Sequence, residues 1–454
     1  MSAPGESRHA TAREESPFDP SRTLERLLYC WRAANAGMPP QSQTGQHAMV
    51  STKTDRASDG NLVVPSQGPV APSNRIEGID VLRGLALFGV LTINIVFEFR
   101  VSIFEQFLPP TDTVPAIDRA LKDVLAAAIE LKALALFSFL FGVGLAIQFD
   151  RLTNNPRRLT LLIRRLVVLL VIGAAHLFLL WNGDILVEYA VAGLIVLPFL
   201  FGPRWFALLA ATAALVLFLT MPLLPPVVQF PSHLWIRDHI TEAARAYDDG
   251  GFLDVLAFRV REIPAIFPLH VLIFPRTIAL FLFGALVWRS GILRRASEHR
   301  SLLFGLAMGG VLFGGALTIA AQGRALFGWP SLGRAHEVIE RLGGVILAVG
   351  YAATVVGLVS VPAGQRILAW AAPVGRMAFT NYLGQSLILG WIFYGYGFGL
   401  FSRLSVTTAF TIGVVVYAVQ VAISAWWLGR YRYGPVEWLW RSLMYGTWQP
   451  MVQP

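Results

Sequence analysis

The feature that most constrains this chain is a repeated pattern of apolar segments, each close to 20 residues long, between residues 81 and 428. About 20 residues of α-helix cross the hydrocarbon layer of a bilayer. Because backbone polar groups find no water in lipid, only helices or closed barrels span a membrane, and continuous apolar runs favour helices. With 55% hydrophobic and 14% charged residues, the chain is predicted to be an all-α, polytopic transmembrane bundle.

The apolar segments predict about ten transmembrane helices, whose ends are defined to within a few residues. The predicted spans are 81–99, 131–149, 162–181, 185–201, 205–224, 270–291, 302–322, 342–361, 376–399 and 408–428.

The links between these spans alternate in charge. Links 150–161 and 289–301 and the tail after 429 are rich in arginine, whereas links 100–130 and 225–269 carry more acids than bases. By the positive-inside rule the basic links face the cytoplasm, and an even number of spans places both termini there.

The N-terminal tail and the link 225–269 carry predictions of their own. Residues 1–74 are rich in Ser, Pro, Gly and charge, which predicts a disordered or weakly helical tail preceding one transmembrane domain, 75–454. Link 225–269 has the pattern of two short amphipathic helices at the outer interface. This outer loop is interpreted either as a lid over a site or as a spacer.

Several common kinds of site are not indicated. The formal net charge of +9 is spread over separate links, so we expect no nucleic-acid partner. The single cysteine, Cys30, lies in the tail, and His233, His239 and His270 lack the spacing of a metal site. We expect no metal and no permanently bound cofactor, and the sequence specifies no oligomeric state.

The first predicted span carries polar residues at both ends. At 3.6 residues per turn, Asp80, Arg83, Asn94 and Glu98 lie close to one helix face, and about 21 Å separates Asp80 from Asn94. Burying Asp80 and Arg83 is costly unless they pair. Two interpretations stay open: a structural ion pair, or the charged mouth of a buried path.

The segment 164–193 contains the most informative histidine. His176 follows Arg164 and Arg165 along the third predicted span and precedes Asp184 and Glu188. A carboxylate beside an imidazole fixes its tautomer and raises its basicity, as a general base requires. The alternative is a histidine that hydrogen-bonds two helices together.

Polar residues also mark the C-terminal third of the chain. In the span that starts near Arg376, Asn381 and Gln385 are four residues apart, which is typical of amides that join helices or bind a ligand. Glu437 and Arg441 have the same spacing, which predicts a structural ion pair on an aromatic helix at the membrane interface.

Five segments that occur in this order resemble the YeiB-like family of bacterial membrane proteins. They are RIEGIDVLRGLALFGVLTIN from Arg75, LFSFLFGVG (136–144), HLFLLWNGDILVEYAVAG (176–193), GRMAFTNYLGQSLI (375–388) and GPVEWLWRSLMYG (434–446). The resemblance extends from about residue 75 to the C-terminus. It implies a multi-pass protein of the bacterial cytoplasmic (inner) membrane.

The distant relatives of that family include membrane acyltransferases of the heparan-glucosaminide N-acetyltransferase and acyltransferase-three types. The resemblance therefore implies transfer of an acyl group from cytosolic acyl-CoA, a co-substrate, to an envelope glycan or lipid. The N-acetyltransferase relatives place a catalytic histidine just after the first span, whereas residues 97–107 contain none. His176 is therefore assigned that role by its position.

In this hypothesis His176 is the general base, Asp184 orients it, and Asn94 donates to the oxyanion. Basic groups suit the phosphates of the donor, and the donor site is assigned to Asp80, Arg83, Arg164, Arg165 and Arg376. The acceptor side or channel is assigned to Glu98, Glu188, Tyr189, Asn381 and Gln385.

Two other classes of function are compatible with the pattern. Charges inside a membrane also mark the pathways of transporters and flippases, although the polar segments of the two halves show no inverted repeat. A scaffold for other envelope proteins is the third class. Membrane lipid is the partner that all three classes share.

Overall fold

The computed structural model describes residues 77–108, 114–226, 228–327 and 333–453. In these ranges the fold is all-α, and the only extended pairing is one isolated bridge between Tyr431 and Val452. The prediction of a disordered or weakly helical tail over residues 1–74 lies outside the described residues.

The prediction of a transmembrane helical bundle is confirmed. Within the described residues, eight helical segments are long and apolar enough to cross a membrane, α6 is a shorter apolar helix, and α14 is a 16-residue helix with several buried polar side chains. The eight segments are Glu77–Phe99, Ala116–Arg151, Arg158–Leu180, Arg204–Leu223, Phe252–Ser290, Arg300–Gln322, Arg334–Val359 and Val406–Leu428. The two shorter helices are α6 (Leu186–Phe201) and α14 (Ala378–Phe393).

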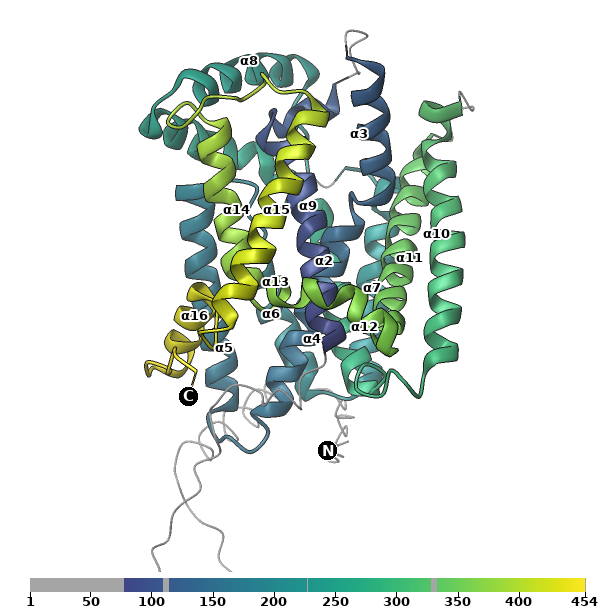
Figure 1. The fold of residues 1–454 in the computed structure, drawn as a ribbon. Coiled ribbons are helices and arrows are strands. Elements are labelled where there is room, and N and C mark those ends of the chain that lie inside the picture. The colour runs from purple at the N-terminus through teal and green to yellow at the C-terminus, as the bar shows by residue number, and fades with distance from the viewer. Residues whose placement is uncertain (1–76, 109–113, 227, 328–332, 454) are drawn as a thin grey trace, which may run out of the picture. The chain divides into compact units, whose positions relative to one another are not determined.

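The elements that build the bundle have the following bounds: α2 Glu77–Ile93, α3 Ala116–Ala128, α4 Lys132–Arg151, α5 Arg158–Ala175, α7 Arg204–Thr220, α8 His233–Asp249, α9 Phe252–Ser290, α10 Arg300–Phe327, α11 Arg334–Val359, α12 Pro362–Leu368, α13 Ala372–Arg376, α15 Val406–Leu428 and α16 Pro435–Tyr445. Figure 1 shows α8 across one end of the bundle and α16 at the other. We call the end at which α8 lies the α8 end, and the end at which α16 lies the basic end. Helix α2 begins at the basic end, so both ends of the described chain lie there.

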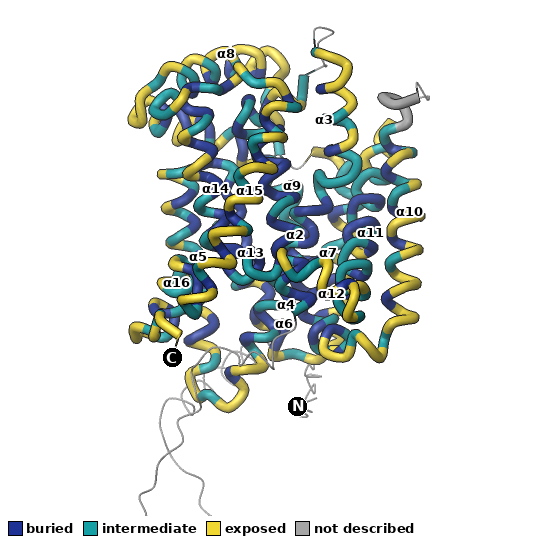
Figure 2. The backbone as a smooth tube through the Cα atoms, in the orientation of Figure 1, coloured by how far each residue is buried: buried dark blue, intermediate teal, exposed yellow. Residues whose placement is uncertain are grey.

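The first span lies inside the protein and not at its lipid-facing surface. In the most apolar stretch of α2, 78% of the residues are buried, against 22% in α10, as Figure 2 shows by colour. The polar stripe of the first span is therefore surrounded by protein, where ionisable groups can find partners.

Close approach of helices depends on small residues. Gly142 on α4 lies against the backbone of Phe281 on α9, and Gly284 on α9 lies against the carbonyl of Phe139, so a Cβ at either glycine would collide with backbone. In a membrane such small residues let two helices pack through backbone contacts. Gly375 on α13 approaches the Asp80 carbonyl in the same way and holds Arg376 beside the start of α2.

Two predicted segments differ from the structure. The second amphipathic helix expected in 225–269 is not separate, because residues from Phe252 continue without a break into the 39-residue helix α9. The span expected over 376–399 ends at Phe393, and Gly399 has a φ of +59°, a conformation that favours glycine and does not continue a helix.

Two spans change from α-helix to π-helix near the α8 end. The first π-helical segment is Asn94–Phe99, after α2, and the second is His176–Leu180, after α5. In the second, the Trp181 N–H donates to the His176 carbonyl five residues back, over 2.8 Å. Such segments occur frequently at functional sites because the extra residue redirects side chains. Both begin at a residue that the sequence assigns to catalysis.

Candidate functional site

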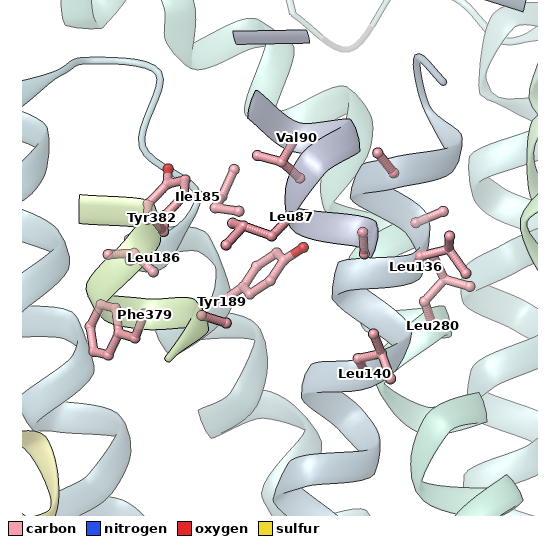
Figure 3. Close-up of a cluster of buried hydrophobic side chains, with 14 of the residues drawn as sticks. Leu87, Val90, Leu136, Leu140, Ile185, Leu186, Tyr189, Leu280, Phe379 and Tyr382 are labelled. Carbon is pink, nitrogen blue, oxygen red and sulfur yellow. The ribbon is translucent and has the colours of Figure 1, made fainter. Parts of the chain in front are cut away.

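A pocket of about 350 Å³ lies among α2, α4, α5, α6, α14 and α16. The charged part of its lining consists of six arginines and two carboxylates: Arg83, Arg151, Arg165, Arg376, Arg432, Arg441, Asp80 and Glu437. The rest is mainly apolar and aromatic and includes Leu186, Tyr189, Phe379 and Tyr382, which Figure 3 shows close together. A small number of charged groups on an apolar wall is typical of a ligand site.

The arginines at the basic end are held by specific contacts. Arg83 Nη1 donates to Asp80 Oδ1 over 3.2 Å, so the predicted pair forms and also lines the pocket. The guanidinium of Arg165 lies 4.0 Å from the ring centroid of Trp440, whose Nε1 donates to the Arg165 carbonyl over 2.9 Å. Held in this way, guanidinium groups suit phosphate or carboxylate ligands.

The predicted ion pair between Glu437 and Arg441 is wrong. Glu437 Oε1 instead accepts the backbone N–H groups of Phe379 and Thr380, over 2.7 and 3.1 Å, and its Oε2 accepts the Thr380 hydroxyl. The free N–H groups of the first turn of α14 are better partners than an arginine on the same short helix. Arg441 stacks on Tyr433 and lines the pocket.

The pocket contains most, but not all, of the predicted donor site. Asp80, Arg83, Arg165 and Arg376 line it. Arg164 does not, because its side chain is exposed and lies beside Gly446. Neighbouring residues of a helix point about 100° apart, so only one of the two arginines can face the pocket.

His176 joins two polar side chains within the bundle. Its Nδ1 lies 2.8 Å from Asp184 Oδ1, and its Nε2 lies 2.8 Å from the Ser386 hydroxyl. With an ionised Asp184, which only accepts, and a neutral imidazole, Nδ1 donates to Asp184 and Nε2 is the acceptor for the Ser386 hydroxyl, which also lies 3.5 Å from the Tyr382 carbonyl. The other Asp184 oxygen accepts the Val187 N–H in the first turn of α6, over 2.8 Å. All three side chains are buried.

The sequence of contacts Ser386, His176, Asp184 is the arrangement found in serine acyl-transfer enzymes. In the sequence, His176 and Asp184 are eight residues apart, and Ser386 follows 210 residues after His176. Ser386 is not among the residues that the sequence assigns to the site, because no periodicity connects it to His176. The motif TNYLGQS, which contains Ser386, was the available signal.

The His176 cluster lies between the pocket and a second, much smaller cavity. Toward the pocket, the ring of Tyr382 lies 5.2 Å from the ring of His176. Toward the α8 end, the ring of Trp181 lies 6.3 Å from that of His176. Trp181 lines the small cavity, whose volume of about 10 Å³ is close to that of one water molecule. Carboxylates of Glu98 and Glu262 also line this cavity.

Helix α8 lies across the end of the bundle (Figure 1), and its Tyr247 lines the small cavity together with Glu262. Glu262 accepts hydrogen bonds from Asn182, His239 and Tyr247 over 2.5, 2.7 and 2.7 Å. Because His239 and Tyr247 belong to α8, these bonds attach α8 to α9 and to the link after α5. The lid and the spacer both stay predictions for this segment.

Glu188 and Tyr189 have hydrogen-bond partners other than His176. Glu188 accepts from His270 and Thr277 on α9, over 2.9 and 2.5 Å. Tyr189 lines the pocket, and its hydroxyl lies 2.7 Å from that of Ser138.

The two amides of α14 face α15. Asn381 donates to Ser424 over 2.9 Å, and Gln385 donates to Gln420 over 2.9 Å. Neither amide lines either cavity among the described residues. Their position favours the interpretation that they join helices. Asn94 is buried and makes no hydrogen bond to His176, Asp184 or Ser386, so its oxyanion role stays a prediction.

Comparison with known proteins places these residues in a wider group. A family model described as "Protein of unknown function (DUF418)" matches residues 287–447, which include α14, α15 and α16. The "Uncharacterized protein YxaH" of Bacillus subtilis (strain 168) is 33% identical over 403 residues, covering 85% of this chain and 98% of that protein. The "Uncharacterized protein YeiB" of Escherichia coli (strain K12) is 28% identical over 381 residues, covering 80% and 95%.

Proposed function

This chain belongs to the YeiB-like family of integral membrane proteins, and we propose that it transfers an acyl group from acyl-CoA to an envelope glycan or lipid. The observation that carries the proposal is the buried hydrogen bond of 2.8 Å between His176 and Asp184, positioned next to an arginine-lined pocket. A base, a site for an anionic donor and a route between them are what acyl transfer requires.

The donor fits the pocket by charge and by polarity. Acyl-CoA carries several phosphate charges, and six arginines against two carboxylates give the lining a positive excess. Toward Leu186, Tyr189 and Tyr382 the lining becomes apolar, which suits the acyl chain and its thioester. In this arrangement the phosphates stay at the basic end, and the reactive carbon points toward His176.

The proposed orientation follows from the same charges. Acyl-CoA is made in the cytosol, so the basic end faces the cytoplasm of the bacterial inner membrane, with both ends of the described chain on that side. The acceptor then approaches from the α8 end, past the cover formed by α8. His176, oriented by Asp184, removes the proton of the acceptor hydroxyl.

The experiment uses the full chain in liposomes with radiolabelled acetyl-CoA and extracted envelope glycans and lipids. We expect covalent label in one acceptor fraction, and loss of that label with His176→Ala. His299→Ala is the control, because His299 lies in the link after α9, outside both cavities. A His176→Ala protein that inserts normally and transfers label at the normal rate contradicts the assignment.

A transporter is the second candidate, and one observation favours it. Among the described residues, three histidine–carboxylate pairs form: His176 with Asp184, His270 with Glu188, and His239 with Glu262. Chains of such pairs carry protons in pumps and transporters. In the same liposomes, movement of unmodified substrate across the membrane without covalent label supports this candidate and contradicts acyl transfer.

A further inference from the structure

The Ser386 hydroxyl lies within hydrogen-bond distance of the proposed base. It lies 2.8 Å from His176 Nε2, on the side of the ring opposite Asp184. Tyr382, which lines the pocket, is one helical turn before Ser386 on α14, so the hydroxyl lies about 6 Å deeper along that helix. Ser386 is therefore beyond the end of the pocket where the acyl group is expected.

The structure leaves little room for acyl-CoA and the acceptor to bind side by side at His176. The donor pocket has a volume of about 350 Å³, whereas the cavity on the acceptor side has about 10 Å³. His176 and Ser386 are buried between the two cavities. A mechanism in which only the acyl group passes this point needs far less space than one in which donor and acceptor bind together.

On the premise of the proposed acyl transfer, we propose that Ser386 is a covalent acyl carrier between two half-reactions. In the first, Ser386 Oγ attacks the thioester carbon and gives its proton to His176 Nε2. The carbon–sulfur bond breaks, and the thiolate takes that proton and leaves as free CoA. The acyl group is then an ester of Ser386, and His176 is again neutral.

In the second half-reaction, the acceptor hydroxyl gives its proton to His176 Nε2 while its oxygen attacks the ester carbon. The bond from that carbon to Ser386 Oγ breaks, and Oγ takes the proton back from His176. Asp184 holds the Nδ1–H in both steps and stabilises the imidazolium that forms in each. The assignment adds a catalytic residue to His176 and makes acyl transfer a double displacement.

The first test needs no acceptor. The full chain in detergent is incubated with acetyl-CoA and radiolabelled free CoA, and the label that enters acetyl-CoA is measured. A double displacement catalyses this exchange, and Ser386→Ala is expected to lower it by about a thousandfold or more. Mass spectrometry of the wild-type chain quenched in acid is expected to find an acetyl group on Ser386.

A matched variant separates the chemical role from a folding effect. Ser424→Ala removes another buried serine that hydrogen-bonds a neighbouring helix, but Ser424 lies outside both cavities. It is expected to keep the exchange within about twofold. If Ser386→Ala fails to insert, Ser386→Cys replaces it and is expected to hold a thioester that neutral hydroxylamine cleaves.

The outcomes distinguish the two proposals. A wild-type chain that labels an acceptor but catalyses no CoA exchange, or a folded Ser386→Ala chain that transfers at the wild-type rate, overturns the carrier role and leaves acyl transfer in place. A wild-type chain that labels no acceptor and catalyses no exchange overturns both.

Discussion

Asp184 Oδ1 and His176 Nδ1 lie 2.8 Å apart, although the side chains of the two residues are only 0% and 1% exposed. An unpaired carboxylate at this depth would be strongly destabilising. The second oxygen of Asp184 accepts the Val187 N–H, so the start of α6 also supports the negative charge. The pair is thus fixed by a helix terminus on one side and by the imidazole on the other.

The first prediction concerns the charge of Asp184. Asp184→Asn keeps the size of the side chain but allows an amide N–H to face His176 Nδ1, which favours the wrong tautomer. We expect the rate of acetyl transfer to fall by a factor of about 10² to 10⁴, with little change in the temperature of unfolding. Initial rates with radiolabelled acetyl-CoA measure this, and a wild-type rate in the variant rules out the orienting role.

The second prediction uses two adjacent arginines. Arg165 lines the pocket, whereas Arg164 on the same helix is exposed. Arg165→Ala is expected to weaken CoA binding by about 10- to 100-fold, because a charged hydrogen bond contributes about 1.5–3 kcal/mol. Arg164→Ala is the control and is expected to change the dissociation constant for CoA by less than about threefold. Calorimetry measures both constants, and equal effects argue against the pocket as the donor site.

The third prediction concerns Glu437, which caps the start of α14 at the basic end. Burial raises the pKa of Glu437, partly offset by its hydrogen bonds to Thr380. A carboxyl group whose pKa is raised on folding stabilises the fold at low pH, and this contribution is lost as the pH rises through the folded-state pKa. The free energy of unfolding is therefore expected to fall as the pH rises above about 4.5.

Glu437→Gln cannot titrate and is expected to lack this pH dependence. Glu437→Ala removes the cap and is expected to cost about 1–2 kcal/mol. Thermal unfolding in detergent between pH 4 and 7 tests both variants. Identical pH profiles for wild type and Glu437→Gln would show that another group controls the dependence.

The fourth prediction tests the attachment of α8. Tyr247→Phe removes one of the three hydrogen-bond donors to the Glu262 carboxylate. The buried carboxylate then accepts one hydrogen bond fewer. The loss is expected to be about 1–3 kcal/mol and to appear as faster hydrogen exchange in residues 233–249. Binding of acyl-CoA should not change, because Tyr247 does not line the arginine-lined pocket. Unchanged exchange in α8 would mean that other contacts hold this cover.

The fifth prediction compares two glycines on different helices. Gly284→Ala places a methyl group against the Phe139 carbonyl and is expected to destabilise the bundle by about 1–3 kcal/mol. A Cβ added at Gly309 on α10 would meet no atom within 4 Å beyond its own stretch of helix, so Gly309→Ala is expected to be neutral or to stabilise by up to about 1 kcal/mol. Unfolding in detergent measures both, and similar values would contradict the close packing of α4 and α9.

The fold class followed from apolar length, because the thickness of a bilayer fixes the length of a spanning helix. Helix ends were less predictable. The link 225–269 contains enough charge to look like a surface segment, yet residues from Phe252 extend α9 beyond the apolar part of the helix. Local polarity does not end a helix when the backbone can continue its hydrogen bonds.

The candidate site was partly predictable, and the errors in its prediction have a common cause. The pair of His176 and Asp184 was predictable because the two residues are close in sequence. The pair of Asp80 and Arg83 was predictable because both side chains lie on one face of the same helix. Ser386 comes from a helix that meets His176 only after the bundle has folded. Glu437 was assigned a partner four residues away, whereas its real partners belong to the start of α14. Sequence spacing describes one helix and carries no information about which helices become neighbours.

The π-helical turn at His176–Leu180 fixes the rotation of His176 relative to the residues that follow it. Such a turn holds one residue more than a regular α-helical turn. Deleting one residue from it would leave a helix of nearly the same length and apolar character. The imidazole, however, would turn by about 100° relative to every residue after it, so it would no longer face Asp184.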